Sequence, residues 1–230
     1  MIEVHNTGIN PDLYCYETSI KFAEDFGKRL LERIKSDEDF LILEKRYLSP
    51  LEKMKEIAEQ LTFEEGKRFG RRVKQYQKLN IKPIEFKQYS MPKELTEEFI
   101  SLIPQWIKDI DTFHPVVQIS RNGEMLPPHR GHQRKSSLFM LLQGNGEQTK
   151  WYQETDSFEV FDFFRVPDLD KIENIVTATL EPFKWTMFNH KAWHSVHKFG
   201  NDLRINIGID FDNIAAEELL NIVKKNEMRV

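Results

Sequence analysis

The chain has 230 residues, a length that suits one large domain or a core with a helical extension. Hydrophobic residues make up 40% of it and charged residues 30%, a composition that excludes wholesale disorder. The net charge of −4 arises from 33 basic and 37 acidic residues, and it gives no reason to expect a nucleic-acid partner or an anionic membrane surface.

Cysteine content and the N-terminus bear on the compartment. The single cysteine, Cys15, has no partner for an internal disulfide, so nothing requires an oxidising environment. The opening "MIEVHNTGIN" has no basic region followed by an apolar core, and no apolar run is long enough to span a bilayer. We therefore expect a soluble, cytoplasmic protein with no membrane partner.

The first 112 residues have mainly helical signals. Phe22, Phe26, Leu30 and Ile34 recur every four residues and predict an amphipathic helix. Pro104 predicts a kink in the last of these helices. The predicted helices cover residues 19–35, 49–61, 62–76 and 92–110, and a strand is predicted over 84–90.

The character of the sequence changes after Phe113, where short β-branched or aromatic runs alternate with turn signals. Asn122-Gly123 predicts a tight hairpin. The tail, 213–226, returns to helical periodicity. The predicted strands cover 115–120, 136–144, 149–154, 158–164, 175–183, 185–190 and 203–211.

These elements give no internal repeat and no linker, so residues 1–230 are expected to form a single domain. Within it we expect a mainly helical supporting region over 1–112, a β core over 113–212 and a C-terminal helix over 213–230. A helical layer that supports an all-β barrel or jelly roll is the architecture that this order favours.

The strand "RINIGIDF" alternates strictly between apolar and polar residues. Ile205, Ile207, Ile209 and Phe211 therefore share one face, and the polar residues beginning with Arg204 share the other. The polar face either meets water or looks into the interior of a small barrel, where it would bind a charged ligand.

Two of the seven histidines have a context that favours a functional role, although a solitary histidine is more often structural. His129 follows two prolines and comes just before a strongly apolar strand, and His194 lies ten residues before Arg204. His132 is close in sequence to His129, but the flanking Pro and Gly exclude a helix that would align them. His194 and His197 differ by an odd number, so a strand places them on opposite faces.

The segments "LPPHRG", "RKSSL", "TKWYQE" and "WTMFNHKAWHSVHKFGNDLRINIGIDF", within residues 115–212, resemble the Fe(II)/2-oxoglutarate-dependent oxygenase superfamily. That family folds as a double-stranded β-helix, a cupin-like jelly roll. The resemblance therefore implies an α+β fold in which a helical N-terminal layer and a C-terminal helix flank the jelly roll. It also implies that His129 and His194 are iron ligands and that Arg204 pairs with the distal carboxylate of 2-oxoglutarate, a strong and directional interaction.

The same resemblance suggests further residues around the co-substrate. Asn206 faces the same way as Arg204 and would add a donor. His190 and Trp193 flank the distal histidine and would support it or form a wall. The other candidates for the co-substrate pocket are Ser137, Lys135, Lys150 and Tyr152.

Gly131 stands where the family usually has Asp or Glu, and this departure leaves several alternatives. The chain is similar to the aspartyl/asparaginyl β-hydroxylase branch, which has the same His-x-Gly pattern and would bind iron with two histidines. It is also similar to the halogenase branch, in which chloride takes the vacant position. A third alternative is a non-catalytic jelly-roll binding protein, and a fourth is that His132 or a nearby acid supplies a third ligand.

The substrate cannot be predicted beyond a small molecule or a peptide, and the oligomeric state stays open. The basic run "GKRFGRRVKQYQK" is typical of a solvated helix face, and the alternative is a docking site for an acidic peptide or a carrier domain.

Overall fold

The structure is a computed structural model that describes residues 1–47, 62–79, 82, 84–110, 113–121, 123–131, 134–160, 166–197 and 203–228. The helix predicted over 49–61 lies outside these residues, and so do His132 and the end of the strand predicted over 158–164. Among the described residues, no helix is long and apolar enough to cross a membrane.

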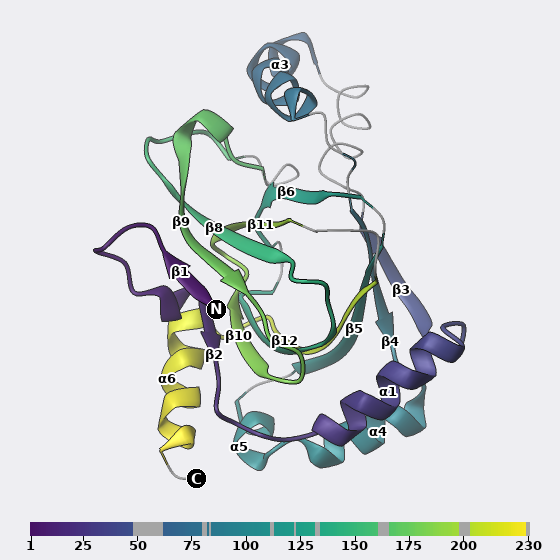
Figure 1. The fold of residues 1–230 in the computed structure, drawn as a ribbon. Coiled ribbons are helices and arrows are strands. Elements are labelled where there is room, and N and C mark those ends of the chain that lie inside the picture. Colours follow the sequence, from purple (N-terminus) through teal and green to yellow (C-terminus); the bar gives the residue numbers. More distant parts are fainter. Residues whose placement is uncertain are drawn as a thin grey trace.

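Two antiparallel sheets form the centre of the molecule (Figure 1). One has five strands in the order β1-β9-β8-β11-β6, and the other has seven in the order β2-β10-β7-β12-β5-β4-β3. The bounds of the strands are β1 Ile2–Val4, β2 Cys15–Glu17, β3 Ile42–Tyr47, β4 Glu85–Ser90, β5 Phe113–Arg121, β6 Met125–His129, β7 Ser136–Gln143, β8 Gln148–Glu154, β9 Ile172–Thr179, β10 Trp185–Asn189, β11 Trp193–His197 and β12 Arg204–Phe211.

The strand order identifies the fold. From β5 to β12 the chain repeatedly crosses between the sheets, so that β5, β7, β10 and β12 lie in the seven-stranded sheet and β6, β8, β9 and β11 in the other. Two facing antiparallel sheets wound in this way form a double-stranded β-helix, or jelly roll. The predicted α+β jelly roll with a C-terminal helix is therefore confirmed.

Helices cover the outer face of the seven-stranded sheet. Apolar side chains of α1, α4, α5 and α6 pack with the outward isoleucines of β12 in the larger hydrophobic cluster. Figure 1 shows α1, α4 and α5 under this sheet and α3 at the opposite end of the molecule. The helices span α1 Glu24–Ser36, α3 Phe63–Lys78, α4 Lys93–Leu102, α5 Gln105–Lys108 and α6 Ala216–Glu227, with short 3-10 helices η1 Pro11–Leu13 and η2 Leu169–Lys171.

Three predictions of local structure need correction. Pro104 separates two helices, α4 and α5, instead of kinking one, because the residue before a proline is pushed out of the helical region, and Ile103 is extended. Residues 158–160 are not a strand. The strands β5 and β6, which precede and follow the predicted hairpin turn, belong to different sheets and therefore do not form a hairpin.

The region 1–112 also contributes strands to both sheets. β1 pairs with β9 at the edge of one sheet, and β2 pairs with β10 at the edge of the other. β3 and β4 extend the seven-stranded sheet beyond β5. Such short or charged edge strands have little of the periodicity that identified the central ones.

The strand β12 is buried on both faces. Its apolar side chains join the helix-covered cluster, whereas Arg204, Asn206 and Asp210 are at most 7% exposed and point to the other side, between the two sheets. Of the two alternatives for this polar face, the structure supports the one that turns it into the jelly-roll interior.

Candidate metal centre

His129 and His194 are direct neighbours across two paired strands. His129 is the last residue of β6 and His194 the second residue of β11, and the two form a register pair. Their ring centroids are 4.4 Å apart, with the ring planes inclined by 54°. The sequence placed them 65 residues apart, and the antiparallel pairing of β6 with β11 brings them together.

Backbone carbonyls fix the tautomer of both rings. Nδ1 of His129 donates to the Pro127 carbonyl at 2.8 Å, and Nδ1 of His194 donates to the Ala192 carbonyl at 2.9 Å. A ring that carries its proton on Nδ1 keeps a lone pair on Nε2, which is the form that ligates a metal. Both imidazoles are therefore oriented as Nε2 donors by the strands that carry them.

Burial keeps these rings neutral. It lowers the pKa of His129 to about 4, against the effect of the Pro127 hydrogen bond. Burial also lowers the pKa of His194 well below its ordinary value, and the neighbouring His129 adds to the effect. At pH 7 both lone pairs are free of protons.

Aromatic and polar residues surround the pair. The Phe188 ring meets His194 edge-on at 4.9 Å and also contacts Trp151 at 5.0 Å. His190, whose ring centroid is 5.9 Å from that of His194, is held by a 2.8 Å hydrogen bond between its Nε2 and the Ser137 hydroxyl. The expected supporting role of His190 and the inward position of Ser137 both fit this arrangement.

Beside the histidines lies an ion pair whose two residues were not predicted from the sequence. Nη1 of Arg134 contacts Oδ2 of Asp210 at 2.8 Å, and both side chains are largely buried. The positive charge of Arg134 contributes to the lowered pKa of His129, His190 and His194. The signal for Asp210 was its place on the polar face of β12, two strand repeats beyond Asn206.

Gly131 has a packing reason to be glycine. Its N–H donates to the His190 carbonyl at 2.6 Å, which joins the two turns that carry the candidate ligands. A Cβ at this position would lie 2.9 Å from Cβ of His190, 3.1 Å from the Arg134 carbonyl and 3.2 Å from the His190 carbonyl. Two of these three neighbours are backbone atoms, so an Asp or Glu would require the turns to separate.

No third protein ligand is present among the residues that the structure describes, since no group of three or more His, Cys, Asp or Glu side chains is arranged to hold a metal. Asp210 is the buried acid on this side of the interior, and Arg134 already binds its carboxylate. His132 lies outside the described residues. The donor set is thus two neutral imidazoles, which suit a first-row transition metal such as Zn, Cu, Fe or Ni and leave several coordination positions open.

Arg204 and Asn206 supply polar groups on the facing sheet. Arg204 is 7% exposed, and within the described part of the chain its guanidinium forms no ion pair or hydrogen bond. Burial lowers its pKa, which the charge of Glu147 partly offsets. Oδ1 of Asn206 and Nε1 of Trp151 are also buried without a hydrogen-bond partner among these residues. Such unmatched groups are costly unless a polar ligand satisfies them.

Three other residues predicted for the co-substrate pocket do not face the histidine pair. The ammonium of Lys135 donates to the Asn213 carbonyl at the exposed end of the barrel. Tyr152 pairs with Trp193, so it faces away from the side of β8 and β11 that carries Trp151 and His194. Its hydroxyl forms a 2.8 Å hydrogen bond with Ser195. Lys150 is the register partner of Ser195 and lies on that outer face as well.

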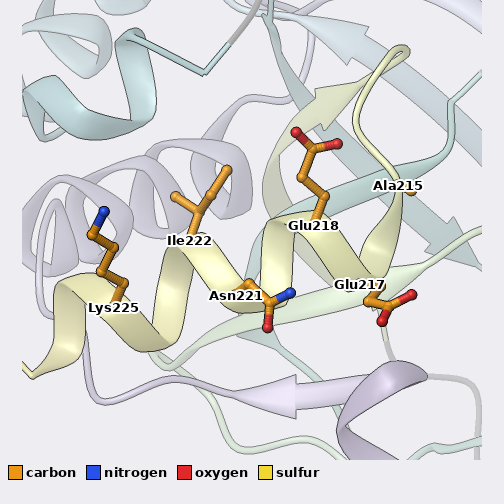
Figure 2. Close-up of a pocket in the computed structure, with 6 residues that line it drawn as sticks. All are labelled: Ala215, Glu217, Glu218, Asn221, Ile222 and Lys225. Atoms are coloured by element: carbon orange, nitrogen blue, oxygen red, sulfur yellow. The ribbon is translucent and has the colours of Figure 1, made fainter.

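Two surface pockets of the described chain lie away from the histidine pair. Figure 2 shows one along α6, where side chains including Glu217, Glu218 and Lys225 line a shallow depression on the helix. Because α6 packs on the outer side of the seven-stranded sheet, this pocket has no access to the interior. The other pocket lies along α3.

Comparisons with known proteins add little to this geometry. No protein-family model matches the chain, and no curated protein matches it. Among solved structures, E. coli ycfD is 18% identical over 60% of this chain and 36% of its own, with a TM-score of 0.35. A vicilin from Solanum melongena is 14% identical over 56% and 28%, with a TM-score of 0.32, and a Bacillus subtilis oxalate decarboxylase is 10% identical over 58% and 27%, with a TM-score of 0.30.

This chain therefore matches only about a third of these structures' length, or less. Likenesses with TM-scores this low support neither a function nor a fold, and the jelly-roll assignment rests on the strand order.

Proposed function

We propose that this protein is an Fe(II)- and 2-oxoglutarate-dependent oxygenase in which His129 and His194 hold the iron without a protein carboxylate. The observation that carries the proposal is the orientation of the two rings. Both Nδ1 atoms are bound to backbone carbonyls, neither Nε2 has a hydrogen-bond partner among the residues that the structure describes, and the ring centroids are 4.4 Å apart. This arrangement presents two neighbouring Nε2 donors in the form that ligates a metal.

The interior suits an anionic co-substrate. Arg204 offers a buried cation, and Trp151 offers a buried N–H without a partner in the described residues. A guanidinium–carboxylate pair is worth about 1.5–3 kcal/mol as a charged hydrogen bond. Two neutral imidazoles leave the charge of Fe(II) uncompensated, so binding of the 2-oxoglutarate dianion would neutralise it.

The chain's own residues would bind and orient the metal, and they would keep water out of the site. His129 and His194 would hold the metal, while the carbonyls of Pro127 and Ala192 keep their rings in the ligating orientation. Phe188 and Trp151 form an apolar wall beside His194 that limits the access of water. Bound iron would supply the oxygen chemistry that decarboxylates 2-oxoglutarate and hydroxylates a C–H bond of the substrate.

The packing of Gly131 bears on the halogenase alternative. In that alternative the glycine makes room for chloride. Here the contacts with His190 and with the Arg134 carbonyl explain the glycine without any ligand. The glycine is therefore no argument for a halide, and we propose hydroxylation.

Turnover of the co-substrate tests the proposal without knowledge of the substrate. Protein incubated with Fe(II), ascorbate, oxygen and 2-oxoglutarate is expected to form succinate slowly, and His194→Ala is expected to abolish this. His197→Ala is the matched control, because His197 lies on the same strand and faces the opposite way. Wild-type protein that forms no succinate and binds no Fe(II) would make the jelly roll a non-catalytic module.

A further inference from the structure

The exposed face of α3 carries a stripe of positive charge. Lys67, Arg71, Lys74 and Lys78 follow the spacing of a single helix face, and all four are exposed. They line a surface groove together with Gly66, Gly70, Gln75 and Asp170. The whole chain is acidic, with a net charge of −4, so this stripe is a local reversal of sign.

The opposite face of α3 anchors the helix. The fully buried Tyr76 donates its hydroxyl to the Pro128 carbonyl at 2.9 Å, and the buried Arg72 donates to the Glu159 carbonyl. The basic stripe therefore lies on a different side of α3 from Tyr76, and of its four members Arg71 contacts Asp168 and Asp170 at η2.

The charges of the stripe are only partly neutralised. Arg71 pairs with Asp170 at 2.9 Å and Lys67 with Glu64 at 3.3 Å, and each of these side chains is at least 60% exposed. Exposed pairs of this kind contribute little and exchange readily for a better partner. Within the described residues, neither Lys74 nor Lys78 forms a salt bridge, although the charge of Lys78 helps to lower the pKa of Asp170.

The groove also has an open backbone. Among the described residues, nothing lies within 4 Å of where a Cβ would stand at Gly66 or Gly70. A glycine inside a helix costs about 0.5–1 kcal/mol relative to alanine. Because the two glycines have no side chains, another chain can approach the helix backbone closely beside Lys74.

We propose that this groove binds an acidic segment of a partner polypeptide. The stripe runs from residue 67 to residue 78, about 16 Å along a helix, which matches roughly five residues of extended peptide. Carboxylates of such a segment would meet the four cations. Glu64 and Asp170 already pair with Lys67 and Arg71, and the carboxylates of the peptide would replace them. Four cations along about 16 Å of helix match a short acidic peptide better than the long phosphate backbone of a nucleic acid.

This inference goes beyond the proposed oxygenase function, since the groove needs no metal. The test is fluorescence anisotropy of a fluorescein-labelled hexaglutamate peptide at 50 mM salt, with hexaglutamine as the neutral comparison. Wild-type protein is expected to bind hexaglutamate with a saturable isotherm that weakens at higher salt, and to ignore hexaglutamine.

The double variant Lys74→Glu/Lys78→Glu is expected to weaken hexaglutamate binding at least about tenfold. Lys93→Glu/Lys225→Glu is the matched control, because it changes the net charge equally at exposed positions on α4 and α6 and should change binding less than about twofold. The milder Lys74→Gln/Lys78→Gln pair serves if the reversal disturbs folding, with a loss of about threefold or more.

The inference is overturned if hexaglutamate does not bind wild-type protein, if both double variants lose affinity equally, or if hexaglutamine binds as well. Tighter binding of a single-stranded oligonucleotide of the same charge would also overturn it, in favour of a nucleic-acid site.

Discussion

At the scale of single residues, the candidate centre depends on small backbone contacts more than on the identity of the histidines. Carbonyls two residues before His129 and His194 decide which ring nitrogen carries the proton. The family that the sequence resembles usually has a carboxylate at the position of Gly131. Here the close approach of Gly131 to His190 leaves no room for a side chain. These contacts follow from the tertiary pairing of two turns and cannot be read from spacing.

Gly131→Ala tests the packing account of the glycine. Its new Cβ would meet His190 at 2.9 Å, so the free energy of unfolding should fall by about 1–3 kcal/mol. Gly66→Ala is the matched control, because its Cβ meets no atom within 4 Å and a helical alanine should stabilise by about 0.5–1 kcal/mol. Urea denaturation measures both. A Gly131→Ala protein as stable as wild type would mean that the turns separate freely and that packing does not explain the glycine.

The buried histidines predict how stability depends on pH. The pKa of His129 and that of His197 are both lowered to about 4 by burial, compared with an ordinary value near 6.5. The unfolded chain therefore binds more protons between these values, and the metal-free protein should lose stability as the pH falls from about 6.5 to 4. The change should be about 2–3 kcal/mol for His129, with less from the more exposed His197.

Urea denaturation of metal-free protein at pH 7.5, 5.5 and 4.5 measures this dependence, and His129→Gln should reduce its slope. An equal slope in the variant would show that other groups control the acid sensitivity.

At the scale of elements, pairing explains what local patterns predicted and what they did not. Strong periodicity predicted α1, β7, β12 and α6, whose apolar faces are buried, and the alternation along β12 predicted a polar face that turned out to lie inside. β6 and β11 were not predicted as strands, because "MLPPH" contains two prolines and "WHSVH" is short and polar. These two unpredicted strands carry both candidate metal ligands.

α3 supports the strand that carries His129. Tyr76→Phe removes the hydroxyl that donates to the Pro128 carbonyl and leaves this buried acceptor unpaired, so stability should fall by about 1–3 kcal/mol. Because Pro128 directly precedes His129, Fe(II) affinity should fall as well. Tyr89→Phe is the control. Tyr89 lies on β4, away from the histidines, and its hydroxyl donates a hydrogen bond to Glu38 that the substitution removes.

Denaturation and anaerobic Fe(II) titration of the two tyrosine variants separate a general loss of stability from a local effect on the site. Equal Fe(II) affinity in both variants would show that the contact of α3 with Pro128 does not affect the metal centre.

At the scale of the whole molecule, the jelly roll combines groups that the chain keeps apart. The sequence predicted His129, His194, Arg204, Asn206 and Ser137 as candidates, and strand register places all five on the inner faces of the two sheets. Tyr152 and Lys135 could not be excluded from sequence. The face of Tyr152 depends on the register of β8 with β11, and the direction of Lys135 depends on a contact with the turn at Asn213. The Arg134–Asp210 pair depends on tertiary structure in the same way.

The most direct test of the central claim is the visible absorption of the anaerobic protein with Fe(II) and 2-oxoglutarate. Wild-type protein should develop the weak charge-transfer band of chelated iron. His129→Ala and His194→Ala should lose the band, and His197→Ala should keep it. Arg204→Met should need about 10–100-fold more 2-oxoglutarate to reach the same intensity, as expected for the loss of a charged pair. Absence of the band in wild type, or its persistence without either ligand histidine, would contradict the account.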